Sequence, residues 1–138
     1  MLRNNLGSQL IPAALLALLS AIAASALLPG GWFNSHEGIA PIERILALSY
    51  EIRNGDCYPR WLSSAYQSQG LPFFNFYSPM FYLTAAYLYT LGLPLLFALK
   101  FVTGLMFFAG SLGMFIWVRK HCGAAGGLIS AIVYLFLP

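Results

Sequence analysis

The sequence predicts an all-α membrane protein with about three transmembrane helices and a long extracytoplasmic loop that contains two interfacial helices. The first observation is composition: 59% of the 138 residues are hydrophobic and only 8% are charged. A soluble domain carries roughly 25% charged residues, so this chain has too few charges to cover a soluble surface. The second observation is that the apolar residues gather into uncharged runs of about the length that crosses a bilayer.

The charged residues and the cysteines exclude several other classes. The net charge is +3 and the basic residues are scattered, whereas a nucleic-acid-binding domain needs a clustered basic face. Cys57 and Cys122 are the only cysteines; we place them on opposite sides of the membrane and expect no disulfide, and their spacing matches no metal motif. We therefore expect no nucleic-acid partner and no cofactor, and the need for a divalent metal stays open.

The first predicted span covers residues 10–28. This run has no charged residue and, at 1.5 Å per residue, reaches about 28 Å, close to the roughly 30 Å thickness of the hydrocarbon core. A cleaved signal peptide is the alternative, because residues 21–23 and 24–26 resemble the small-residue cleavage pattern. The apolar region of a signal peptide is usually about 7–15 residues long, which favours a retained span that ends at Pro29-Gly30-Gly31.

Two interfacial helices are predicted inside the loop of residues 29–94. A helix over about 39–53 is indicated by Pro41, which suits a first helical turn, and by the stop signal Asn54-Gly55. Its apolar residues recur at helical spacing, so this face should lie on the membrane. Ala47 falls on the polar side with Glu43 and Tyr50. The apolar stripe consists of Ile39, Ile42, Ile45, Leu46 and Ile52.

The second interfacial helix is expected over about 80–91. This piece is apolar, but it has too few residues before Gly92 and Pro94 to cross a bilayer unaided. Its tyrosines suit the headgroup level, where an aromatic ring can be half hydrated. A tilted span from Pro79 to about Leu99, kinked at Pro94, is the alternative.

Two further spans are predicted over 95–118 and 123–138. Lys100 lies about one turn inside the first of these, from where its flexible side chain can reach back to the interface. Arg119-Lys120-His121 ends this span, and the second begins with the small residues 123–127, which favour close helix packing. Because the sequence ends in an apolar run, we expect the N-terminal part of a larger membrane protein, or a truncated gene product.

Basic residues in the short loops set the expected orientation. If residues 80–91 do not cross the membrane, Arg3 and the Arg119-Lys120 pair share one side, which the positive-inside rule makes cytoplasmic. The chain is then integral to the cell membrane, with a cytoplasmic N-terminus and an extracytoplasmic loop at residues 29–94.

Side-chain chemistry can come mainly from residues 35–79, because this stretch holds every Asp and Glu of the chain. Glu37 directly follows the first span and could serve as a general base or be a solvated acid at a helix N-terminus. Arg60 beside Trp61 suits phosphate binding, and it equally suits anchoring at the interface. The residues contain no phosphate-binding glycine loop and no recognisable metal or triad motif, so on their own they name no reaction.

The loop resembles a known family. The loop contains, in order, a carboxylate after the first span, an Arg seven residues on, a helix ending in Gly, a YPRW turn and then GLPFFNFYSPMFYL. This order of features is similar to the first outer loop of GT-C-type membrane glycosyltransferases. The resemblance is greatest to the integral membrane family labelled "6-pyruvoyl-tetrahydropterin synthase-related", although nothing in the sequence suggests pterin chemistry. It covers roughly residues 30–95, through His36-Glu37, Arg44, Gly55 to Trp61, and Gly70 to Pro79.

The resemblance implies transfer of a sugar from a polyprenyl-phosphate donor on the extracytoplasmic side. Glu37 would be the catalytic base that activates the acceptor; it replaces the more usual Asp and is one methylene longer. The implied partners are membrane lipid, the polyprenyl-phosphate sugar, and further C-terminal segments or another membrane subunit. The alternative is a non-catalytic membrane protein whose outer loop binds lipid headgroups or a partner subunit. The implied substrate-binding residues are His36, Arg44, Arg60, Trp61, Tyr77 and Lys100.

Overall fold

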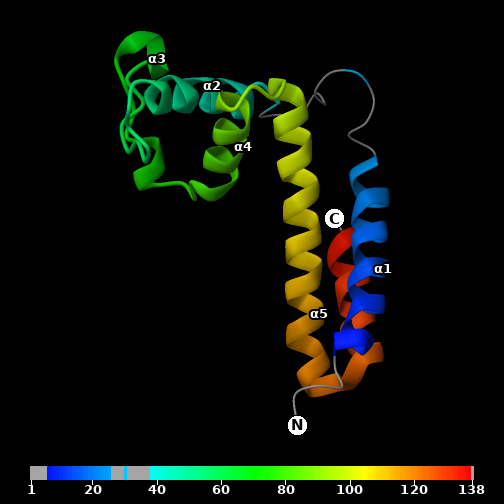
Figure 1. The fold of residues 1–138 in the computed structure, drawn as a ribbon. Helices are drawn as coiled ribbons and strands as arrows, with labels where there is room; N and C mark the ends of the chain where they lie inside the picture. Colours follow the sequence, from blue (N-terminus) through cyan, green and yellow to red (C-terminus); the bar gives the residue numbers. More distant parts are fainter. Residues whose placement is uncertain (1–5, 26–29, 31–37, 138) are drawn as a thin grey trace. The chain divides into compact units, whose positions relative to one another are not determined.

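The computed structural model describes residues 6–25, 30 and 38–137, and this part of the chain is all-helical, which confirms the predicted class. The chain divides into two compact units. One contains α1 and the part of α5 from Thr103 onward, and the other runs through α2, α3 and α4 to the beginning of α5 at Val102. The elements are α1 (Leu6–Ala24), α2 (Ala40–Arg53), α3 (Ala65–Ser68), the 3₁₀ helix η2 (Phe73–Asn75), α4 (Met80–Thr90) and α5 (Leu95–Phe136) (Figure 1).

The first unit contains three helical segments, because α5 is broken at Gly123. This residue has φ 72° and ψ −178°, which no α-helix contains. The segment after the break folds back along the segment before it (Figure 1), and a Cβ at Gly127 would lie 3.0 Å from the carbonyl oxygen of Phe115. Leu16, Phe115 and Ala131 form the buried core of the unit. The break lies at Gly123, between the segments predicted over 95–118 and 123–138, and residues 119–122 are still helical.

One helix in the described part of the chain, α5, is long and apolar enough to cross a membrane. Its most apolar window has a mean hydropathy of 1.9, and only 22% of that window is buried. A core helix of a soluble protein would be mostly buried, so the uncovered apolar surface indicates association with a membrane. The apolar part of α1, Ile11–Ala24, is shorter. The predicted crossings by residues 10–28, 95–118 and 123–138 all stay predictions.

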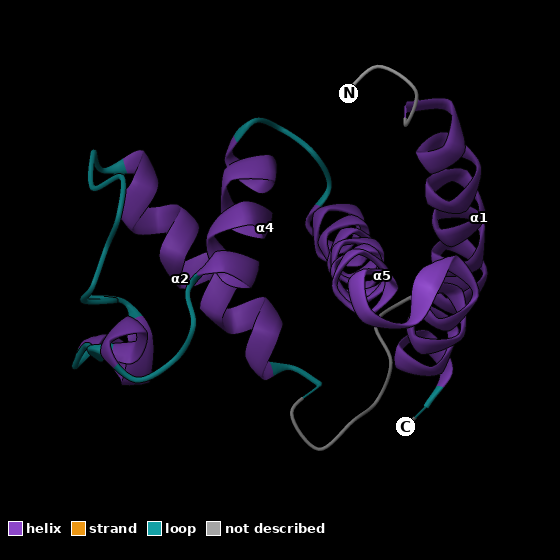
Figure 2. Ribbon diagram, turned by 90° about the horizontal axis from the view of Figure 1, so that it is seen from below, coloured by secondary structure: helices purple, strands orange, loops and turns teal. Residues whose placement is uncertain are grey.

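The second unit is built on the packing of α2 against α4 (Figure 2). The helices predicted over about 39–53 and 80–91 are both present. Pro41 lies in the first turn of α2, as expected, and the N–H of Asn54 bonds to the carbonyl oxygens of Tyr50 and Glu51 at its end. Gly55 follows with φ 101°. At 1.5 Å per residue α4 is about 16 Å long, too short to cross a bilayer alone.

The predicted polar side of α2 is partly wrong, because Ala47, which we expected there, is buried together with Leu48. Both α4 and α3 contact α2, so its buried residues do not follow a single stripe. Ile39 and Leu46 of the predicted apolar stripe are 70% and 41% exposed, and contact of this stripe with a membrane stays a prediction.

Candidate functional site

The guanidinium of Arg44 lies among aromatic rings of the second unit and is partly buried. Its Cζ lies 4.4 Å from the centroid of the Phe73 ring and 5.5 Å from that of Tyr77. Its Nη1 donates a hydrogen bond of 2.9 Å to the hydroxyl oxygen of Tyr82. Contact of a guanidinium with a ring face stabilises by about 0.5–2 kcal/mol. Arg44 is therefore fixed in position by residues from η2 and α4.

The rings around Arg44 support one another. Phe73 stacks on Tyr77 with centroids 4.4 Å apart and an interplanar angle of 4°. Tyr82 meets the edge of Phe73 at 5.7 Å and also lies against Phe74. Aromatic pairs of this kind contribute about 0.5–1.5 kcal/mol beyond their buried area. We call Arg44, Phe73, Tyr77 and Tyr82 the arginine clamp.

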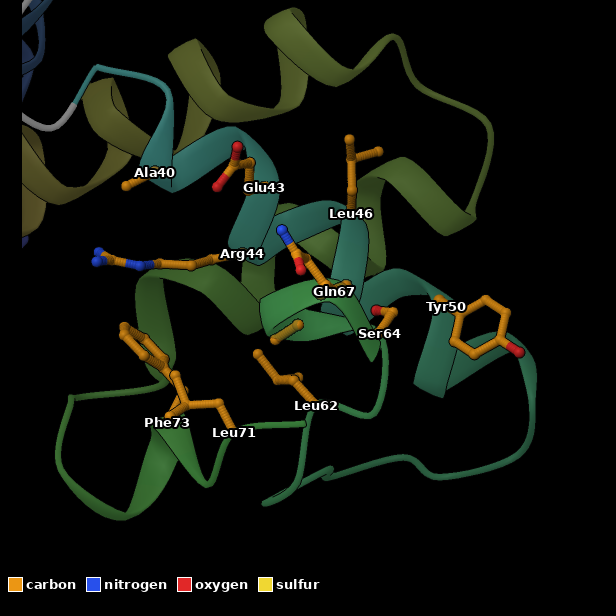
Figure 3. A pocket seen from close by; sticks show the side chains of 12 residues that line it. Ala40, Glu43, Arg44, Leu46, Tyr50, Leu62, Ser64, Gln67, Leu71 and Phe73 are labelled. Carbon is orange, nitrogen blue, oxygen red and sulfur yellow. The ribbon is translucent and has the colours of Figure 1, made fainter. Parts of the chain in front are cut away.

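A pocket of about 680 Å³ opens beside the clamp, within the second unit. Arg44 extends past the ring of Phe73 at one end of the pocket, and Tyr50 lies at the other (Figure 3). Most of the wall is apolar, and its polar side chains are those of Glu43, Arg44, Tyr50, Ser64 and Gln67. The described lining residues are Ala40, Glu43, Arg44, Leu46, Ala47, Tyr50, Leu62, Ser64, Ala65, Gln67, Leu71 and Phe73.

A short loop closed by Leu62 and Leu71 forms the wall of the pocket opposite α2. The two residues exchange backbone hydrogen bonds of 2.9 and 3.1 Å, and α3 lies between them. Glu51 of α2 attaches this loop: its carboxylate accepts hydrogen bonds from the backbone N–H of Ser63, at 2.7 Å, and from the Ser63 hydroxyl. Glu51 thus has a structural role, and the pocket is bounded by hydrogen-bonded backbone on its loop side.

Gly70 determines how this loop packs on Trp61. It has φ 81°, and a Cβ there would lie 2.4–2.6 Å from atoms of the Trp61 ring. We expect Gly70→Ala to lower the free energy of unfolding by about 2–4 kcal/mol, from left-handed backbone strain and from overlap with the ring. Gly55→Ala is the matched control, because Gly55 has φ 101° with nothing within 4 Å of its Cβ; its cost should be only about 1–2 kcal/mol.

Thermal unfolding in detergent, followed by circular dichroism, measures this difference. Equal losses in the two glycine variants would show that the contact between Gly70 and Trp61 contributes nothing. A Gly70→Ala variant with wild-type stability would contradict the packing described above.

The structure brings some of the predicted site residues together and leaves others apart. Arg44 and Tyr77 meet in the arginine clamp. Arg60 is exposed, Trp61 packs on Gly70, and Lys100 is half-buried on α5. The described pocket lining does not include these last three. His36 and Glu37, the latter being the predicted catalytic base, lie outside the residues that the structure describes, so both roles stay predictions.

Several residues of the site were not predicted as such. Phe73 and Tyr82 complete the clamp, and Glu43, Ser64 and Gln67 supply polar groups to the pocket. Tyr82 follows Arg44 by 38 residues. Helical periodicity predicts contacts only between residues a few positions apart, so it does not predict this one. The one usable signal was the aromatic density of residues 73–82, which marked the segment without indicating the arginine that it contacts.

The chemistry available in the pocket is that of binding an anion next to an apolar or hydroxylated group. A guanidinium has five N–H donors in a planar fork, and phosphate fits such a fork in bidentate geometry. Among the described residues no group of three or more His, Cys, Asp or Glu is placed to hold a metal ion. Cys57 and Cys122 are both free and exposed.

Comparisons with models of protein families, with curated proteins and with solved structures found no match to the chain.

Proposed function

We propose that this chain is part of a membrane glycosyltransferase that takes a sugar from a polyprenyl-phosphate donor on the extracytoplasmic side. The observation that carries the proposal is the arginine clamp beside the pocket: an oriented guanidinium at one end and a mostly apolar wall along it. A lipid-linked sugar phosphate presents the complementary groups, which are an anionic phosphate, a hydroxylated ring and a hydrocarbon chain.

Rigid placement of Arg44 supports the assignment of the phosphate end. Arginine is the residue best suited to recognising phosphate in a planar, bidentate geometry, and a pre-oriented fork loses less conformational freedom on binding than a mobile one. The exposed apolar surface of α5 supports a donor that resides in a membrane. The resemblance of residues 30–95 to GT-C-type loops connects these features to sugar transfer, with Glu37 as the base.

Transfer assays test the proposal. Membranes that contain the protein are incubated with undecaprenyl-phosphate monosaccharides carrying a radiolabelled sugar, and separately with nucleotide-activated forms of the same sugars. The proposal predicts transfer to an acceptor from a lipid-linked donor and none from the nucleotide donors. Transfer from nucleotide sugars in the absence of polyprenyl phosphate would refute it.

A non-catalytic role in binding lipid headgroups or a partner subunit is the second candidate. It is favoured by the make-up of the pocket, whose described lining comes wholly from residues 40–73 and has Glu43 as its carboxylate. The two candidates differ in turnover: a binding protein retains undecaprenyl-phosphate sugar unchanged, whereas a transferase releases undecaprenyl phosphate.

The proposed orientation places Cys57 outside the membrane and Cys122 on the cytoplasmic side. Both thiols are exposed, so burial within the protein does not prevent labelling of either. We expect an impermeant maleimide added to intact cells to label Cys57, and to label Cys122 only after the membrane is opened. Cys57→Ser and Cys122→Ser variants identify each signal, and the reverse pattern would overturn the orientation.

A further inference from the structure

Apart from Lys100 in the first turns of α5, the charged residues of the second unit lie before residue 61. From Trp61 to Leu99 the chain contains no Asp, Glu, Lys, Arg or His. Between Ala40 and Arg60, by contrast, the unit carries three acids and three arginines, located on α2 and the turn that follows it. Such a segregation is unnecessary for a unit surrounded by water, and it is what a unit half immersed in lipid requires.

Several strongly exposed apolar side chains of the uncharged part lie around one bend, and Leu91, which is 78% exposed, lies at the other end of α4. We call residues 73–80, which comprise η2, the turn after it and the first residue of α4, the aromatic loop. Phe76 is 79% exposed, Met80 66% and Tyr77 54%. Burying a side chain such as Phe or Met contributes about 1.5–3 kcal/mol relative to leaving it in water. Their exposure therefore marks a surface that an apolar partner would cover.

The aromatic loop holds a defined conformation while exposing these side chains. The N–H groups of Phe76 and Tyr77 both bond to the carbonyl oxygen of Phe73, at 3.1 and 3.2 Å. Phe73 and Phe74, at the beginning of the loop, are buried and meet edge to face, with centroids 5.1 Å apart. Phe76 and Met80 thus project from a packed base and need no rearrangement to reach a partner.

The bilayer is the partner that the chain places next to this loop. At its other end α4 is joined through Leu91–Pro94 to α5, the helix that is long and apolar enough to cross a membrane, and the first turns of α5 belong to the same unit. Figure 1 shows α4 and the beginning of α5 running in opposite directions. Within the second unit, the aromatic loop therefore lies at the end of α4 toward which the first turns of α5 run.

We propose that the aromatic loop inserts into the upper hydrocarbon region of the bilayer, with Phe76 and Met80 as its anchors. Asn75 and Ser78 are exposed in the same loop, and their polar side chains restrict insertion to a shallow depth just below the headgroups. This anchoring would hold the second unit at a fixed height against the membrane. The inference does not depend on which reaction the pocket serves.

Site-specific fluorescence tests the proposal in the protein reconstituted into phosphatidylcholine–phosphatidylglycerol vesicles. In a Cys57→Ser, Cys122→Ser background, a single Phe76→Cys or Met80→Cys is labelled with an environment-sensitive fluorophore. Asn54→Cys, at the exposed end of α2 in the charged part, is the matched control. Because all three positions are exposed, labelling should leave the fold intact, which thermal unfolding verifies.

The proposal predicts that a lipid with a nitroxide near the top of its acyl chain quenches the labels at positions 76 and 80 at least twofold more than the label at 54. Aqueous iodide should give the opposite order. Labels at 76 and 80 that iodide quenches as strongly as the label at 54 would overturn the proposal, because the loop would then face water. Labels protected from both quenchers would also overturn it, in favour of a protein partner.

Discussion

Replacement of Arg44 by Ala is expected to weaken binding of undecaprenyl phosphate by at least tenfold. A hydrogen bond to a charged group contributes about 1.5–3 kcal/mol, and roughly 1.4 kcal/mol corresponds to a factor of ten in affinity. In our account the guanidinium gives the phosphate such bonds from a position fixed by Phe73 and Tyr82. Titration of the lipid into the detergent-solubilised protein, followed by native mass spectrometry, measures the dissociation constant.

Two control variants separate the charge of Arg44 from its geometry. Arg53 lies on the last turn of the same helix, and its Cζ is 5.2 Å from the centroid of the Tyr89 ring; Arg53→Ala should therefore change affinity less than twofold. Arg44→Lys keeps the charge and loses the planar fork, so an intermediate loss is expected. If Arg44→Ala and Arg53→Ala weaken binding equally while both remain folded, Arg44 has no special role.

Replacement of Glu37 by Gln is expected to lower the rate of sugar transfer at least a hundredfold. An amide cannot accept the proton of the acceptor hydroxyl, and a positioned general base contributes roughly 10²–10⁴ in rate. Because glutamine has nearly the same size, binding of undecaprenyl phosphate should change less than twofold. The radiolabel transfer assay and the lipid titration together measure both quantities.

Glu43→Gln is the informative control for Glu37, because Glu43 is the carboxylate in the described lining of the pocket. Our account predicts that Glu43→Gln retains transfer to within about tenfold, a smaller loss than removal of a general base causes. A large loss in Glu43→Gln with nearly normal transfer in Glu37→Gln would show that Glu43 is the base. Normal transfer in both variants would exclude general-base catalysis by either carboxylate.

The helices of the second unit could be predicted because local signals determine them. Pro41 and Asn54-Gly55 bound α2, and Pro79 and Gly92 flank α4, so the limits differ from expectation by about one residue. The break of α5 at Gly123 was equally local, since a left-handed φ favours glycine. Each of these features depends on a few consecutive residues, which a sequence displays directly.

The arginine clamp could not be predicted because it depends on contacts that are distant in sequence. Arg44 and Tyr82 belong to different helices, and only the packing of α2 against α4 brings them together. The polar side of α2 was misjudged for the same reason: Ala47 is buried and lines a pocket whose other lining residues extend to Phe73, which no helical periodicity records. Arg60 and Trp61, by contrast, were chosen for their residue types, and the structure places neither in the described pocket lining.

Photo-cross-linking tests the central claim most directly, namely that the pocket beside Arg44 receives the phosphate of a polyprenyl-phosphate lipid. An undecaprenyl-phosphate analogue with a diazirine close to its phosphate is irradiated with the protein in native membranes, and the labelled peptides are mapped by mass spectrometry. Our account predicts cross-links within residues 40–73 that disappear in Arg44→Ala and persist in Arg53→Ala. Cross-links confined to other segments, or unchanged in Arg44→Ala, would contradict it.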